Sequence, residues 1–293
     1  MDYGYEPVLT KLPEGYIPRE QWPEYDLPSD APKFLGPRLV GKTPKGMYRR
    51  LWPIVVEEYI SDDEPVLEDS DPEGIALNRV LIWQRPTRND VPKGWRTLSK
   101  KTSRLEGFAE VVEEEYWKHW SESSRRYRKK WHADHFNKTH TIERVSYEEF
   151  EKAYKKSSVW KTLKDILLDL IKRKLSSPAA PHVELWGARS ASTGNVVAGM
   201  ATLTSPSCRG SYYISGFITP EGEPDPVMIG LMDHWFALSF AQGTKFLQFG
   251  GFWIPGNPKN WKGFSLFKQK FGLSYIAYGI TLFRFKKGRL FNF

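Results

Sequence analysis

The sequence predicts an α+β fold in which a mixed, twisted β-sheet is flanked by helices. From residue 183 onward, apolar segments typical of strands are interrupted by two helical segments, which gives the order β-β-β-α-β-α-β. Upstream of residue 183, apolar residues recur at three- and four-residue steps, as they do in amphipathic helices. A chain of 293 residues, 40% of them hydrophobic, can bury the core that this fold requires.

Three segments are expected along the chain. Residues 1–50 form a proline-rich arm, because the eight prolines among the first 45 residues disfavour both helix and inner strand. The aromatic residues of the arm indicate that it lies on the folded body. Residues 51–95 form a small β-like module around the runs WPIVVEEYI and NRVLIWQRP, and this module packs on the main domain of residues 96–293.

Three helices are predicted before the strand-rich part. The first runs from about Ser103 to Lys130, where apolar residues follow a helical period: Phe108, Val111, Val112, Tyr116 and Trp120. The second begins at a capping box in which Ser146 is the N-cap and Glu149 its partner. The third covers WKTLKDILLDLIKRKL and ends before SSPAAP, with basic residues in its last turn.

The strand-rich part begins with VELWGARS, VVAGMATLTS and SYYISGFI. A helix follows, with Asp225 as N-cap, Pro226 at the first helical position and Gly243 at its end. The next strand is KFLQFGGF, and GFSLFKQKFG is a short helix closed by Gly272. The segment SYIAYGITLFRFKK is predicted to be the last strand or hairpin.

Charge is unevenly distributed along the chain. Residues 234–293 hold nine basic residues and no acid, whereas residues 57–73 hold nine acids and no base, within a net charge of +8. The C-terminal part should therefore favour anions, without a uniform coat for nucleic acid. The single cysteine, Cys208, excludes an internal disulfide, and we expect neither metal nor redox chemistry. Without an apolar run of about 18 residues, a cytoplasmic protein is expected.

Three further motifs invite functional interpretations. GPRLVGKT at Gly36–Thr43 fits a phosphate-loop pattern, but prolines and bulky residues replace the required strand-to-helix context, so a chance match is favoured. The histidines of HADHFNKTH stand beside a basic run that would repel a metal ion. The run SSRRYRKKW, with Arg125, Arg126 and Lys129, is compatible with both a phosphate-binding patch and an ordinary solvated helix face.

The segment FGG followed by GNPKNWKGFSLFKQKFG resembles the glycine-rich turn and the G-[IF]-x-x-F-K-x-x-F-G helix of the FemA/FemB/FemX peptidyltransferases. This family, with its peptidoglycan-bridge and BioF2-like relatives, is a branch of the GNAT acyltransferase superfamily. The resemblance extends over residues 95–293. It implies a GNAT-like sheet whose fourth and fifth strands splay apart, leaving a cleft for the acyl donor.

The resemblance also implies a site. The ammonium of Lys268, the lysine of the F-K-x-x-F-G pattern, would stabilise the oxyanion of a tetrahedral intermediate. Glycines at the end of the fifth strand would let the donor approach the backbone closely. The residues expected to contact substrate are Phe267, Gly250, Gly251, Asn257, Trp261, Phe217, Arg125, Arg126 and Lys129. The general base is left open between Glu221, Glu223 and the departing ribose oxygen, and Gln248 stands where relatives often have Asp.

The implied activity is transfer of an aminoacyl or acyl group from an activated ester to an amine, with a peptidoglycan-precursor peptide among the acceptors. The loop TPEGEPDP lacks the R-x-x-G-x-G/A pattern that grips the pyrophosphate of CoA, because its acids repel phosphate and its prolines lack amide donors. We therefore expect aminoacyl-tRNA as donor and no cofactor. A CoA-dependent N-acyltransferase and a non-catalytic RNA-binding or scaffold protein remain alternatives, and transient contact with a membrane surface stays open.

Overall fold

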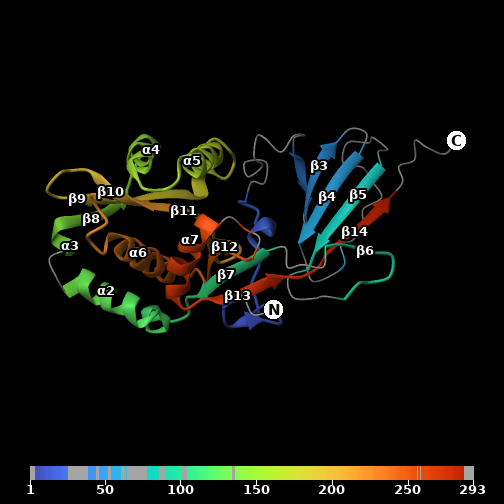
Figure 1. Cartoon of the computed structure of the whole chain (residues 1–293), viewed down its shortest axis with the longest axis horizontal. Coiled ribbons are helices and arrows are strands. Elements are labelled where there is room, and N and C mark those ends of the chain that lie inside the picture. The colour runs from blue at the N-terminus through green and yellow to red at the C-terminus, as the bar shows by residue number, and fades with distance from the viewer. Residues whose placement is uncertain are drawn as a thin grey trace.

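The computed structural model describes residues 4–25, 39–43, 46–51, 54–60, 64, 78–85, 90–99, 104–133, 136–255, 257 and 259–286. These residues form two β-sheets that lie in separate lobes of the molecule (Figure 1). The larger lobe carries the described helices on both faces of its sheet. None of these helices combines the length and the apolar character needed to cross a membrane.

The larger sheet has eight strands. In spatial order they are β1 (Val8–Leu9), β13 (Ser274–Tyr278), β7 (Arg104–Glu110), β12 (Phe246–Gly251), β11 (Gly210–Ile218), β10 (Val196–Ser205), β9 (Val183–Ser190) and β8 (His140–Arg144). The pairs β1/β13 and β11/β12 are parallel, and the other neighbours are antiparallel. The predicted mixed sheet flanked by helices is therefore confirmed.

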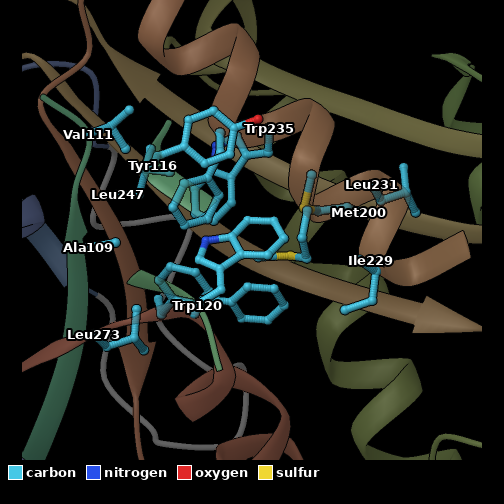
Figure 2. Close-up of a cluster of buried hydrophobic side chains, with 14 of the residues drawn as sticks. Ala109, Val111, Tyr116, Trp120, Met200, Ile229, Leu231, Trp235, Leu247 and Leu273 are labelled. Carbon is cyan, nitrogen blue, oxygen red and sulfur yellow. The ribbon is translucent and has the colours of Figure 1, made fainter. Parts of the chain in front are cut away.

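Helices cover the two faces of this sheet. They are α2 (Glu122–Ala133), α3 (Phe136–Thr139), α4 (Tyr147–Lys156), α5 (Lys161–Leu175), α6 (Val227–Ala241) and α7 (Lys262–Lys268), with short 3-10 turns η1 (Arg19–Gln21), η2 (Tyr116–His119), η3 (Ala180–His182), η4 (Lys259–Trp261) and η5 (Gln269–Phe271). Strand β10 divides the core: Met200 packs in the cluster under α6, while Ala201 packs in the cluster under α4 and α5. Figure 2 shows Met200, Trp120 and Trp235 within the cluster under α6.

Most of the predicted boundaries are confirmed. The capping box of Ser146 and Glu149 opens α4, and both Gly243 and Gly272 adopt the left-handed conformation that ends a helix. The N-cap of α6 is Pro226, one residue later than predicted. The Asp225 carboxylate lies 3.6 Å from the His140 imidazole, so it faces β8 instead of capping the helix.

The first predicted helix is wrong over its N-terminal half. Residues Arg104–Glu110 form β7, a central strand with five consecutive buried residues, and α2 begins only at Glu122. A strand that is covered on both faces has a nearly continuous apolar sequence. In this segment the apolar residues also fall at three- and four-residue steps, which is the spacing expected of a helix. The expected single C-terminal strand or hairpin is also corrected, because β13 and β14 (Thr281–Lys286) belong to different sheets.

The smaller sheet gathers strands from distant parts of the chain. Its spatial order is β2 (Leu39–Thr43), β3 (Gly46–Leu51), β4 (Ile54–Ile60), β5 (Asn78–Gln84), β14 and β6 (Arg96–Ser99). The expected boundaries at residues 50/51 and 95/96 therefore do not coincide with the division between the sheets. The last part of the phosphate-loop pattern is β2, whereas residues 36–38 lie outside the described residues.

Residues 4–25 of the arm pack on the larger sheet, as the aromatic residues there predict, whereas residues 39–43 and 46–50 belong to the smaller sheet. Strand β1 pairs with β13, and Trp22 is fully buried in the cluster that also contains Tyr25. The Trp22 indole Nε1 donates to the Ile17 carbonyl, 2.9 Å away, and a Cβ on Gly210 would meet the Trp22 ring at 2.3 Å. Gly210 thus makes the space that receives this indole.

Replacing Trp22 with alanine should destabilise the fold by about 3–5 kcal/mol, because it empties a filled core position. The measurement is the midpoint of chemical denaturation. Trp160, which is 61% exposed, provides the matched control, and Trp160→Ala should change stability by less than about 0.5 kcal/mol. Equal effects of the two substitutions would show that the arm does not belong to the cooperative core.

Candidate functional site

A gap opens in the larger sheet between the parallel strands β11 and β12. The strands pair only over Gly210–Tyr212 and Phe246–Gln248. Beyond Tyr212, β11 continues to Ile218 paired with β10, while β12 continues to Gly251 paired with β7. The facing edges of the two strands are thus released from each other at Phe249. Backbone groups on such an edge need other partners or a ligand.

Lys268, at the end of α7, supplies one of these partners. Its ammonium donates to the Phe249 carbonyl at 2.7 Å and lies 3.5 Å from the Gly251 carbonyl. The Tyr213 and Phe252 rings lie 5.4 and 5.5 Å from Nζ. An ammonium carries three N–H donors, and one short and one long bond leave donor capacity for a third acceptor. The predicted residue therefore lies at the point where the strands part.

Burial, assisted by the positive charge of Arg19, lowers the pKa of Lys268 to about 8. The Glu106 carboxylate acts in the opposite direction. At neutral pH the side chain is therefore still mostly protonated, but it is poised to lose its charge in mildly alkaline solution.

The two glycines beside Lys268 differ in what surrounds them. Gly250 has a φ of +71°, and a Cβ there would lie 3.2 Å from the Tyr212 ring and 3.3 Å from the Arg19 guanidinium. Gly251 has no heavy atom within 4 Å of its ideal Cβ position. Gly250 is therefore required by backbone conformation and packing, whereas Gly251 leaves open space on the edge of the gap.

A buried ionic cluster backs the site, and sequence reasoning did not find it. The Glu106 carboxylate of β7 lies 3.0 Å from the Arg19 guanidinium and 3.1 Å from that of Arg104. Against the effect of burial, Arg104 and Arg19 hold the pKa of Glu20 below its ordinary value. Arg19 also stacks 4.2 Å from the centre of the Tyr212 ring. No local signal links residues this far apart in the sequence.

The other predicted residues have separate places. Phe267 is half-buried against Phe271, with ring centres 5.2 Å apart, and Trp261 is 43% exposed beside α7. Asn257 lies in a turn, in which its backbone N–H donates to the Ile254 carbonyl at 3.0 Å. Pro258 and Gly256 of the predicted turn lie outside the described residues.

Phe217 requires a correction. Its side chain is only 3% exposed and stacks on Tyr154 with ring centres 4.8 Å apart, in the cluster under α4 and α5. It is thus a core residue and has no surface to offer a substrate. Arg125, Arg126 and Lys129 lie on α2 and line a separate basic hollow.

The loop between β11 and α6 is closed on itself. The amides of Gly222 and Glu223 donate to the Thr219 carbonyl, and the Asp225 amide donates to Gly222. The Glu221 carboxylate accepts hydrogen bonds from the side chains of Thr193 and Asn195. These amides are already used within the loop, so they do not form the open cradle that a pyrophosphate requires.

Comparisons with known proteins place the fold. No protein-family model and no curated protein sequence matches the chain. A crystal structure of FemX matches with a TM-score of 0.59 and 11% identity, over 90% of this chain and 93% of FemX. L-PGS from Bacillus licheniformis matches with a TM-score of 0.47 and 14% identity over 85% of this chain and 83% of that one. A tandem GNAT protein from the clavulanic acid biosynthesis pathway matches with a TM-score of 0.38 and 9% identity, covering 83% and 79%.

At these identities the likeness to FemX establishes the fold and not the activity. The predicted resemblance to the FemA/FemB/FemX branch of the GNAT fold is confirmed at that level. The diverging β11/β12 pair, joined through α6, is the feature that the resemblance implied.

Gly250→Ala should destabilise the protein by about 1–2 kcal/mol, because an L side chain is strained at positive φ. Gly251→Ala is the control, because its Cβ enters open space. Chemical denaturation of both variants measures the difference. A Gly250→Ala variant as stable as Gly251→Ala would contradict the geometry at the end of β12.

Proposed function

We propose that this protein is an acyltransferase that moves an aminoacyl or acyl group from an activated ester to an amine. The observation that carries the proposal is the position of the Lys268 ammonium, which bonds to the Phe249 carbonyl where β11 and β12 separate. The resemblance of the segment around Lys268 to the FemA/FemB/FemX pattern supports this class of reaction. At this gap a fixed cation faces the edge of a strand that has separated from its neighbour.

In the proposed reaction the acceptor amine attacks the ester carbonyl, forming a C–N bond and a tetrahedral oxyanion. The remaining N–H of Lys268 would donate to that oxyanion, and the negative charge would be stabilised because the half-buried site limits screening by water. Collapse breaks the C–O ester bond. The proton of the amine then passes to the departing oxygen, either directly or through Glu223. Glu221 is the less suitable base, because its carboxylate already accepts hydrogen bonds from Thr193 and Asn195.

An RNA-borne ester is the donor that the surroundings support best. The β11–α6 loop uses its own amides and carries Glu221, Glu223 and Asp225, which would repel the pyrophosphate of CoA. An aminoacyl-tRNA presents its reactive ester without needing that cradle. From the resemblance of the FGG and GNPKNWKGFSLFKQKFG segments to the FemA/FemB/FemX peptidyltransferases, we propose a peptide amine, such as that of a cell-wall precursor, as the acceptor.

Lys268→Met should lower kcat about 10²- to 10³-fold in an acyl-transfer assay, since it removes a charged donor to the oxyanion. Lys262→Met is the control on the same helix, because Lys262 is exposed and lies over Trp253. Full activity of Lys268→Met would overturn the proposed role, as would an equal loss in Lys262→Met.

The pH dependence tests the protonation state. With a pKa of about 8 for Lys268, kcat should fall as pH rises above 8, because the ammonium loses its charge. A Lys268→Arg variant that retains activity should move this fall to much higher pH, because a guanidinium stays charged. A rate that instead increases through pH 8, and loses that increase in Lys268→Arg, would show that the neutral lysine acts as a base.

The donor class can be tested by binding. Aminoacyl-tRNA should raise the melting temperature of the protein, whereas acetyl-CoA at the same concentration should leave it unchanged. A clear stabilisation by acetyl-CoA would reverse the donor assignment. Binding of tRNA with no transfer to any amine would favour a non-catalytic RNA-binding protein.

A further inference from the structure

A basic hollow lies along α2, apart from the gap that holds Lys268. Its volume is about 720 Å³. The lining residues are Trp117, Glu122, Arg125, Arg126, Arg128, Lys129, His132 and Ala133. Five of these eight carry or can carry positive charge, and one is acidic. The composition of the hollow therefore favours an anionic ligand.

The opposite side of α2 is fixed against α6. The Trp131 indole is 5% exposed and lies over Gly230, where a Cβ would meet the ring at 2.5 Å. Gly230 thus allows the two helices to approach closely. Asp233 stands three residues after Gly230, so it faces α2 from the same side of α6. Figure 1 shows the two helices side by side.

Asp233 binds two of the cationic side chains. The carboxylate is buried, accepts the Tyr116 hydroxyl at 2.9 Å, and also contacts Arg128 Nε and His132 Nε2, the latter at 2.6 Å. A buried carboxylate needs such partners to offset its desolvation. Here the partners are Arg128, whose side chain is 23% exposed, and His132, whose side chain is 49% exposed. Both line the hollow, so the carboxylate also fixes their orientation.

Arg128 lines the hollow and is fixed from behind by Asp233. Asp233 engages only its Nε, and the guanidinium lies 5.0 Å from the centre of the Trp117 ring. The Tyr116 hydroxyl also interacts with this guanidinium, and no ion pair to a second carboxylate holds Arg128 within the described residues. A guanidinium held in this way presents two parallel donors, which is the geometry that phosphate accepts.

Exposed cations continue the site along the helix. Arg125 and Lys129 lie one helical turn apart, and Arg126 is their neighbour. Over the described ranges, none of these three forms an ion pair with a carboxylate. Solvated cations at this spacing match a chain of phosphates better than a single anion.

The hollow also adjoins the element that carries Lys268. The Ser121 amide, just before α2, donates to the Lys270 carbonyl of η5 at 2.8 Å. Helix α7 runs directly into η5. A polyanion bound along α2 would therefore be held next to the segment that bears the proposed catalytic lysine.

We propose that the hollow on α2 binds the sugar–phosphate backbone of the RNA-borne donor, and that Asp233 is the positioning residue that orients Arg128 and His132 toward it. This inference rests on the proposed function for the identity of the RNA. The binding chemistry itself, phosphate on a guanidinium fixed from behind, needs only the hollow. A nucleoside diphosphate shares this chemistry and is the other source to be tested.

The first experiment measures tRNA binding by the full chain at several salt concentrations. Arg128→Gln should weaken binding about tenfold, and Arg125→Gln and Lys129→Gln should each reduce the slope of log affinity against log salt by about 1. Lys172→Gln removes the same charge from the exposed surface of α5 and should leave binding unchanged. An equal effect of Lys172→Gln would mean that basic surfaces bind RNA without a built site, and would overturn the proposal.

Asp233→Asn separates positioning from simple charge. Removing an acid makes the protein more positive, so an unstructured electrostatic surface would bind RNA more tightly. The positioned site predicts weaker binding, because Arg128 and His132 lose the carboxylate that orients them. Tighter binding by a folded Asp233→Asn variant would refute the positioning role. If circular dichroism shows that this variant does not fold, Arg128→Gln and His132→Gln decide the question.

Two further arms separate the ligands and the two proposals. Titration with a nucleoside diphosphate and with inorganic pyrophosphate should give much weaker binding than tRNA. Tight diphosphate binding that is lost in Arg128→Gln would reassign the hollow to a small substrate.

In transfer assays, Arg128→Gln should slow reaction from aminoacyl-tRNA but not from a short aminoacyl ester that lacks the RNA body. Lys268→Met should slow both, so failure of the hollow and failure of the catalytic lysine are distinguishable.

Discussion

The separation of β11 from β12 is the constraint from which the site follows. Two parallel strands that pair over three residues and then part leave carbonyl groups without a ladder partner. The Phe249 carbonyl obtains its partner from the Lys268 ammonium, so a backbone requirement and a charged group are satisfied together. A cation held by backbone has a fixed position, and a fixed cation is what stabilises developing negative charge without reorganisation.

The arm contributes to the site as well as to the core. Its Arg19 is joined to Glu106 of the central strand β7, next to Gly250 and Tyr212, and its charge reduces the proton affinity of Lys268. Its Tyr5 hydroxyl donates to the Trp253 carbonyl in the segment between β12 and α7, at 2.8 Å. A buried ionic cluster of this kind contributes little net stability, because desolvation offsets the attraction between the charges. Its value here is that it sets the electrostatic environment of the gap.

Two of the buried carboxylates, Glu106 and Asp233, have different surroundings. The Glu106 carboxylate pairs with Arg19 of the arm and with Arg104 of its own strand, whose side chains are 10% and 25% exposed. Asp233 lies beneath the surface, so its partners Arg128 and His132 are presented outward on α2. In both cases the cations offset the desolvation of the carboxylate, and around Asp233 the cations also line the basic hollow.

Local sequence determined the helices and strands whose signals lie within a few residues. The capping box at Ser146, the left-handed glycines Gly243 and Gly272, and the motif containing Lys268 are of this kind, because caps, turns and short motifs depend on neighbours along the chain. Tertiary structure alone decided that Arg104–Glu110 is a strand, since burial on both faces removes the alternation that marks one. It also decided that Phe217 is core, and it brought Arg19 to Glu106 and Asp233 to Arg128. Each of these depends on pairing between residues far apart in the chain, and such pairing leaves no trace in local periodicity.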